Sequence, residues 1–255
     1  MSRDGSPQAF VEKPGAWIDL ALTLPLFLAY HAGVVFLKIQ NATDVVTPTL
    51  VQLAEGNRGV YLLMTASIGV VFAGIFAWLG RGQAFRTSKF AQVIVEGALY
   101  AIMMRVAGSY VVSNMFAPQA SLFGPLFEDK RFVGMITSMG AGFYEELAFR
   151  VVLFGLGAKV LVSLFAKQNV QVMNQRVVAG TSSFKAFIIM FVWMFAAAAL
   201  FSGMHYIGAL GDKFQMASFI YRMVIGVVLT IIYLTRGFST AVWAHALYDI
   251  WVLVF

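Results

Sequence analysis

The chain has 255 residues, of which 60% are hydrophobic and 12% are charged, and its mean hydropathy is +0.80. A soluble domain of this size is not so apolar, so we expect a multi-pass membrane protein. The net charge of +6 is typical of basic loops beside anionic lipid, and since the cationic residues form no cluster, nucleic acid is not an expected partner. Cysteine is absent, which excludes disulfides, thiolate nucleophiles and cysteine-ligated metals.

Residues 1–15 form a polar tail, and the rest of the chain is a series of apolar runs with polar connectors. In a bilayer every backbone polar group must be hydrogen-bonded within the protein, and apolar runs of this length achieve that as helices. The sequence therefore predicts an all-α, polytopic transmembrane helical bundle. We expect a single domain over residues 16–255, with its informative motifs at 132–255. The apolar runs are residues 16–37, 59–80, 91–113, 132–166, 184–204, 216–235 and 238–255.

The run at 132–166 is too long for one simple crossing, because a helix rises ~1.5 Å per residue and a bilayer core is ~30 Å thick. We expect it to break near Arg150, where glycines follow. A turn back at that point would bring Glu145 to the same membrane level as the end of the 184–204 helix. This arrangement gives about eight crossings, and we favour it because groups that act together must meet.

The distribution of basic residues favours a different count. The loops at 81–89 and 167–185 are both basic and should both be cytoplasmic. They share one side of the membrane only if the 132–166 run crosses once, which gives seven crossings.

Three polar residues in the N-terminal runs are expected to have structural roles. Glu96 and Arg105 are nine residues apart, on opposite sides of a helix, so we expect each to find a partner elsewhere, on another helix or at a headgroup. His31 has no polar neighbours at helical spacing, and we interpret it as a structural hydrogen-bonding residue.

Two adjacent carboxylates and an arginine lie in the middle of the 132–166 run. Charges in hydrocarbon are costly, and where they occur they are usually functional. Glu146 and Arg150 stand four residues apart and share a helix face, so we expect them to pair. Glu145 is turned about 100° away on an α-helix, which leaves it available to accept a proton.

The other two histidines occur late in the chain in similar settings. Phe201 precedes His205 by four residues at the end of one run, so its ring should pack along the imidazole. His245 precedes Asp249 by four residues in the last run, and the carboxylate could fix the tautomer of the ring. Two such histidines beside two glutamates and an arginine indicate a functional site.

This set of side chains suits hydrolysis. A carboxylate and an imidazole in a low-dielectric site can hold and deprotonate a water molecule, and a second histidine can donate to the oxyanion that forms. The same groups could instead bind zinc, since histidine and carboxylate are common zinc ligands. The sequence lacks the HExxH spacing that places two ligands on adjacent helical turns, so we expect no metal or other cofactor.

Three motifs in a fixed order, EExxxR, FxxxH and HxxxD, each in an apolar run, resemble the CPBP family of CAAX proteases and bacteriocin-processing enzymes. This family includes the Ras-converting CAAX endopeptidase of eukaryotes. Each motif is weak alone, and the three in this order are specific. They lie in the C-terminal half, at Glu145, Glu146, Arg150, Phe201, His205, His245 and Asp249.

The resemblance implies an intramembrane endopeptidase of the glutamate type, which hydrolyses peptide bonds of a membrane-associated protein or peptide within the bilayer. It implies that Glu145 and His205 activate the water, and that His245 with Asp249 shapes the oxyanion and substrate site. Glu146 would support this arrangement together with its arginine partner.

One residue departs from the eukaryotic pattern. The eukaryotic enzymes have asparagine at the last motif position, where this chain has Asp249, which looks more like prokaryotic members and implies the prokaryotic plasma membrane. An ionised carboxylate cannot donate to an oxyanion, so we expect Asp249 to orient His245 instead. The same departure weakens the expectation of a prenylated CAAX substrate.

Two interpretations from other classes compete with the protease. In one, the chain is a non-proteolytic immunity or transport-assisting protein, and the polar cluster binds a partner. In the other, it is a transporter or proton-coupled channel that uses the buried carboxylates as a relay. Transporters usually show broken helices in two related halves, and the sequence has no such repeat.

Overall fold

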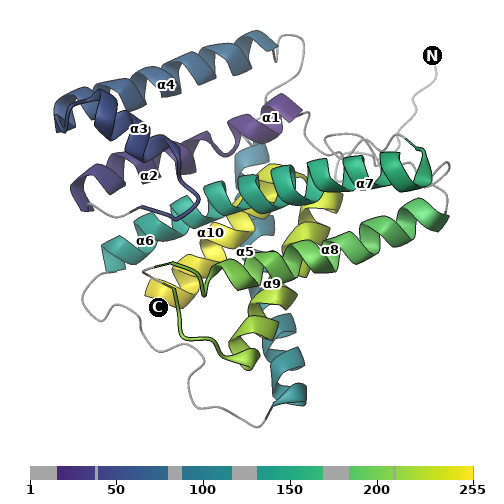
Figure 1. Ribbon diagram of the computed structural model, residues 1–255. Coiled ribbons are helices and arrows are strands. Elements are labelled where there is room, and N and C mark those ends of the chain that lie inside the picture. Colours follow the sequence, from purple (N-terminus) through teal and green to yellow (C-terminus); the bar gives the residue numbers. More distant parts are fainter. Residues whose placement is uncertain are drawn as a thin grey trace, which may run out of the picture.

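The computed structural model describes residues 16–37, 40–79, 88–116, 131–168, 184–208 and 211–254. The expected tail at 1–15 and most of the two basic loops lie outside the described residues. Within the described part the regular structure is entirely helical, which confirms the all-α expectation (Figure 1). The helices are α1 (Ala16–Ala21), α2 (Leu24–Leu37), α3 (Val46–Leu53), α4 (Arg58–Leu79), α5 (Ser88–Met115), α6 (Arg131–Gly140), α7 (Gly157–Ala166), α8 (Phe184–Met204), α9 (Met216–Arg236) and α10 (Phe238–Val254), with π-helical segments η1 (Ala141–Glu145) and η2 (Leu147–Leu156) between α6 and α7.

Among the described residues, six helices are long and apolar enough to cross a membrane, and the shorter α10 is also apolar. These lengths and compositions identify an integral, multi-pass membrane protein. The six candidate spans are Ile18–Leu37, Arg58–Trp78, Ser88–Met115, Arg131–Ala166, Phe184–Met204 and Met216–Arg236.

The expected break near Arg150 is wrong. Helical structure continues from Arg131 to Ala166, through η1 and η2, as one span of 36 residues. The glycines of this region serve close packing instead: a Cβ on Gly157 would lie 2.6 Å from Nε1 of Trp193 on α8. The region therefore contributes one crossing rather than two, as in the count of seven.

Glu145 still lies level with the end of the 184–204 helix, and the reason is the path of α8. Beyond Glu145 the long helix continues for about the length of α8, which has 21 residues. α8 packs against η2 and α7 and returns alongside them (Figure 1), so that His205, just after its last turn, lies near Glu145 at the end of η1. A helical hairpin brings the two groups together without any turn at Arg150.

α10 is the centre of the bundle. It packs against α5, α6, η1 and α9, and much of its surface is buried. Small residues allow close approach here: a Cβ on Gly142 would lie 2.7 Å from the Cβ of Ala246 and 2.8 Å from the carbonyl oxygen of Val242. The small residues before the carboxylates thus admit a neighbouring backbone.

The N-terminus of α10 is held by a distant carboxylate. Asp19 of α1 accepts hydrogen bonds from the backbone N–H groups of Phe238, at 2.6 Å, and Ser239, at 2.9 Å. These are two of the donors that a helix start leaves without a partner in its own helix. Asp19 therefore fixes the start of the helix that carries His245.

Glu96 and Arg105 have partners on other helices. Arg236 of α9 binds Glu96 of α5 through two nitrogens, with Nε–Oε2 at 2.9 Å and Nη2–Oε1 at 2.5 Å. The guanidinium of Arg105 lies 5.1 Å from the centre of the Trp251 ring. Both residues join helices of the bundle, as expected from their spacing.

Candidate active site

Glu146, the residue before η2, and Arg150 of η2 form a fully buried ion pair. Arg150 Nε lies 3.2 Å from Glu146 Oε2, without the alignment of a hydrogen bond, and both side chains are at most 2% exposed. The guanidinium also lies 4.4 Å from the centre of the Phe201 ring, and its Nη2 donates to the carbonyl oxygen of Gly226 at 3.5 Å. The pairing expected from the spacing is confirmed, and it compensates a charge that would otherwise be buried alone.

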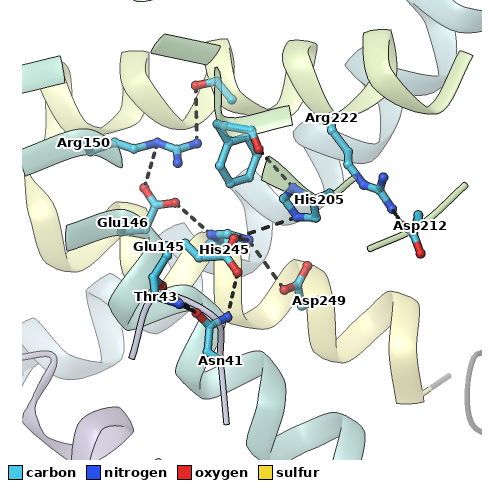
Figure 2. A network of polar contacts seen from close by, with 12 residues as sticks. Asn41, Thr43, Glu145, Glu146, Arg150, His205, Asp212, Arg222, His245 and Asp249 are labelled. Carbon is cyan, nitrogen blue, oxygen red and sulfur yellow. Dashed lines mark hydrogen bonds and ion pairs between the residues drawn. The ribbon is translucent and has the colours of Figure 1, made fainter. Parts of the chain in front are cut away.

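The second oxygen of Glu146 holds His245. Nδ1 of His245 lies 2.8 Å from Oε1 of Glu146 and is the donor of this hydrogen bond when Glu146 is ionised. Nε2 then faces two other carboxylates, at 3.5 Å from Oδ2 of Asp249 and 4.0 Å from Oε2 of Glu145 (Figure 2). The sequence suggested that Asp249 fixes the tautomer of this ring. In the structure the close hydrogen bond of the His245 ring is with Glu146 instead.

His205 follows the last residue of α8 and faces the same point from the opposite side. Its Nδ1 donates to the backbone carbonyl of Phe201 at 3.0 Å, so Nε2 carries the lone pair of the neutral ring. That nitrogen lies 4.0 Å from Oε2 of Glu145. The Phe201 and His205 rings are in edge contact, with centroids 5.1 Å apart, as their spacing predicted.

Burial is the largest of several effects on the charge state of His205. Burial lowers the pKa of His205 below its ordinary value, while the negative charge of Glu145 acts in the other direction without reversing the shift. The ring is therefore neutral near pH 7 and able to accept a proton.

Glu145 lies between the two histidines. Its Oε2 is about 4.0 Å from Nε2 of both His205 and His245, and it has no hydrogen-bond partner among the described residues. The Glu145 side chain is 13% exposed and that of His205 is 31% exposed, whereas Oε2 of Glu145 itself is buried. Three segments of the fold thus bring the predicted groups to one place.

The other oxygen of Glu145 has a partner that the motifs did not reveal. Asn41, in the segment between α2 and α3, donates from Nδ2 to Oε1 of Glu145 at 2.7 Å (Figure 2). In the sequence Asn41 is one of several polar residues in a connector, 104 positions from Glu145. The composition of this connector indicates a turn and does not indicate which part of the bundle the turn contacts.

Across the described part of the chain, no three His, Asp or Glu side chains are arranged to hold a metal ion. Oε2 of Glu145 lies 4.0 Å from Nε2 of both His205 and His245. Zinc is normally held by three or four protein ligands at ~2.0–2.2 Å.

His31 is fully buried and lies in a second polar group beside the first. Its Nε2 lies 2.6 Å from the hydroxyl of Tyr144 and its Nδ1 lies 3.0 Å from that of Tyr61. Both ring nitrogens are therefore satisfied. The structural role expected for His31 agrees with these contacts.

A comparison with protein families finds a match for the half of the chain that carries the site. Residues 120–251 match the family described as type II CAAX prenyl endopeptidase, Rce1-like. The chain belongs to this family. It is thus a membrane-embedded member of a CAAX-type protease family, and all the motif residues lie within the matched segment. No curated protein and no solved structure matches the chain.

Proposed function

We propose that this CAAX-type protease hydrolyses peptide bonds by the glutamate mechanism, with Glu145 and His205 activating a water molecule. The observation that carries the proposal is the distance between the Glu145 carboxylate and the His205 ring. Oε2 of Glu145 and Nε2 of His205 are both acceptors, and 4.0 Å is too long for a direct hydrogen bond. A water oxygen that donates to both atoms fits this separation.

The reaction follows from this placement. Glu145 takes a proton from the water as the oxygen attacks the scissile carbonyl carbon, and His205 holds the water in line. The resulting tetrahedral intermediate carries its negative charge on the former carbonyl oxygen. When the carbon–nitrogen bond breaks, the proton passes from Glu145 to the leaving amine, and a carboxylate and an amine are released.

His245 is the proposed donor to the oxyanion. Glu146 holds its Nδ1, which directs Nε2 to the side of Glu145 where the intermediate forms. With both nitrogens protonated, the ring donates to Glu146 and to the oxyanion, and the neighbouring carboxylates compensate its charge. Loss of one such donor typically costs ~10²–10³ in rate. Asp249, at 3.5 Å from Nε2, is proposed to orient the ring.

We further propose that no metal takes part, and that the substrate is a peptide or membrane protein in a prokaryotic plasma membrane. The absence of an HExxH motif supports the first point. Asp249, in place of the asparagine of the eukaryotic enzymes, supports the second. Whether the substrate carries a prenyl group is decided by the experiment below.

The test uses purified full-length protein and quenched peptides that end in Cys-aliphatic-aliphatic-X, with and without a farnesyl group. We expect cleavage by the native chain and none by Glu145→Gln, which keeps the size of the side chain and removes the base. Comparative peptidomics of membranes that contain either protein identifies natural products. Native protein that yields no product in either assay favours the non-proteolytic interpretation. Activity lost with a chelator and restored by zinc would overturn the metal-free mechanism.

A further inference from the structure

The segment between α2 and α3 contributes a side chain to the catalytic centre, although it lies outside the matched segment. Asn41 donates from Nδ2 to Oε1 of Glu145 at 2.7 Å, and the other carboxylate oxygen faces the two histidines. Figure 2 shows the amide below Glu145, on the side away from Arg150.

The orientation of the Asn41 amide is fixed by its neighbours. Its Oδ1 accepts hydrogen bonds from the backbone N–H of Thr43, at 2.9 Å, and from the Thr43 hydroxyl, at 2.5 Å. Both of these groups are donors, so the oxygen of the amide faces Thr43 and the NH₂ group must face Glu145. A flipped amide would lose its contacts with the backbone N–H of Thr43 and with Glu145, and could keep only the contact with the Thr43 hydroxyl, which can also accept.

The backbone of the segment is anchored as well. The N–H of Asn41 donates to the Tyr30 hydroxyl at 2.8 Å, and that hydroxyl donates to Oδ2 of Asp44 at 2.8 Å. Asp44 also accepts from the backbone N–H groups of Val46 and Thr47 at the start of α3, each at 2.9 Å. Tyr30 is fully buried and Asp44 is 3% exposed, so the anchor is inside the protein.

We propose that Asn41 is a positioning residue for Glu145: it holds Oε1 and thereby directs Oε2 to the point between His205 and His245. The inference rests on the proposed function, because it assigns Oε2 the role of base. A carboxylate that is free to rotate about its last bond spends only part of its time with an oxygen at the water. Misplacement of a reacting group by ~1 Å can cost ~10²-fold in rate.

The decisive variant is Asn41→Asp, which has almost the same shape. Its carboxylate can still accept both hydrogen bonds from Thr43, so the turn is kept, and only the donor to Glu145 is replaced by an acceptor. With the quenched CAAX peptide that the native protein cleaves, we expect kcat to fall by about 100-fold and KM to change little. Asn41→Ala removes the donor without adding charge, and its kcat should fall by about tenfold.

Asn57 provides a matched control. Its side-chain oxygen accepts from the backbone N–H groups of Gly59 and Val60, at 2.9 and 3.2 Å, in a similar turn before α4. Asn57→Asp makes the same chemical change away from the site and should leave kcat unchanged. Native kcat per folded molecule in both Asn41 variants, even with reduced yield of folded protein, would overturn the proposal.

A second measurement does not depend on activity. In a double-mutant cycle of Asn41→Ala and Glu145→Ala, the loss of thermal midpoint caused by Asn41→Ala should shrink once Glu145 is absent. Additive losses would show that the two side chains do not interact, which overturns the inference. If the native protein cleaves neither peptide, the proposed function fails while the cycle still decides the contact.

Discussion

Glu145 and Glu146 are adjacent in the sequence, and their surroundings differ in a way that separates their roles. Glu146 is fully buried and each of its oxygens has a defined partner, in Arg150 and His245. Glu145 is partly exposed, and one of its oxygens faces only the two histidines at about 4.0 Å. These surroundings support the proposed roles, in which Glu146 holds His245 and Glu145 is the base.

The role of Arg150 can be tested by stability. Arg150→Met keeps much of the side-chain volume and leaves Glu146 as a buried charge without its cation, which typically costs ~3–5 kcal/mol. We expect a strong loss of folded protein, measured as abundance in the membrane and as thermal midpoint in detergent. The double variant Glu146→Gln with Arg150→Met removes both charges and should recover most of the loss. Equal losses in the single and double variants would contradict a charge-pair role.

The neutral state of His205 predicts a pH dependence. Because burial lowers the pKa of His205, the ring accepts a proton only below its ordinary value of ~6.5, and protonation removes the lone pair that faces the water. We expect kcat/KM to be constant around pH 7 and to decline on the acid side with a midpoint below ~6.5. A pH–rate profile of the purified protein gives this midpoint. A decline centred above that value would contradict the burial effect.

At the scale of the helices, two consecutive carboxylates reach the same histidine at the point where the two π-helical segments meet. A π-helix has i→i+5 hydrogen bonds and so more residues per turn than an α-helix, which reduces the angle between neighbouring side chains. Glu145 and Glu146 flank the boundary of η1 and η2, and lie 4.0 and 2.8 Å from His245.

The capping of α10 by Asp19 gives a prediction about a helix. Asp19→Ala leaves the N–H groups of Phe238 and Ser239 without their acceptor, and loss of a helix cap typically costs ~0.5–2 kcal/mol. We expect a lower thermal midpoint, and Asp19→Asn, which keeps an acceptor, should lose less. Asp212→Ala breaks an exposed pair with Arg222 and serves as a control with little effect. Equal stability of Asp19→Ala and the native chain would show that the cap is dispensable.

For the whole molecule, composition and motif order predicted the fold class and most of the site. Apolar run length determines helices in a bilayer, and i, i+4 spacing correctly paired Glu146 with Arg150 and Phe201 with His205. These features are local, so the sequence displays them directly.

Features that depend on distant contacts could not be predicted in the same way. The meeting of Glu145 with His205 depends on the return path of α8, and the hydrogen bond from Asn41 to Glu145 depends on where the Asn41 turn lies. The bond between Glu146 and His245 joins residues 99 positions apart. Helical spacing in the sequence cannot predict such contacts, because they form only when the helices pack into the bundle.

The hydrogen bond between Asn41 and Glu145 has a consequence for exchanging parts of the chain between proteins. A chimera that combined residues 120–251 with other leading helices would inherit every motif residue, and it would keep the hydrogen bond to Glu145 only if those helices supplied a donor at the position of Asn41. The segment before α3 and the half of the chain that carries the motifs are thus joined at Glu145 itself.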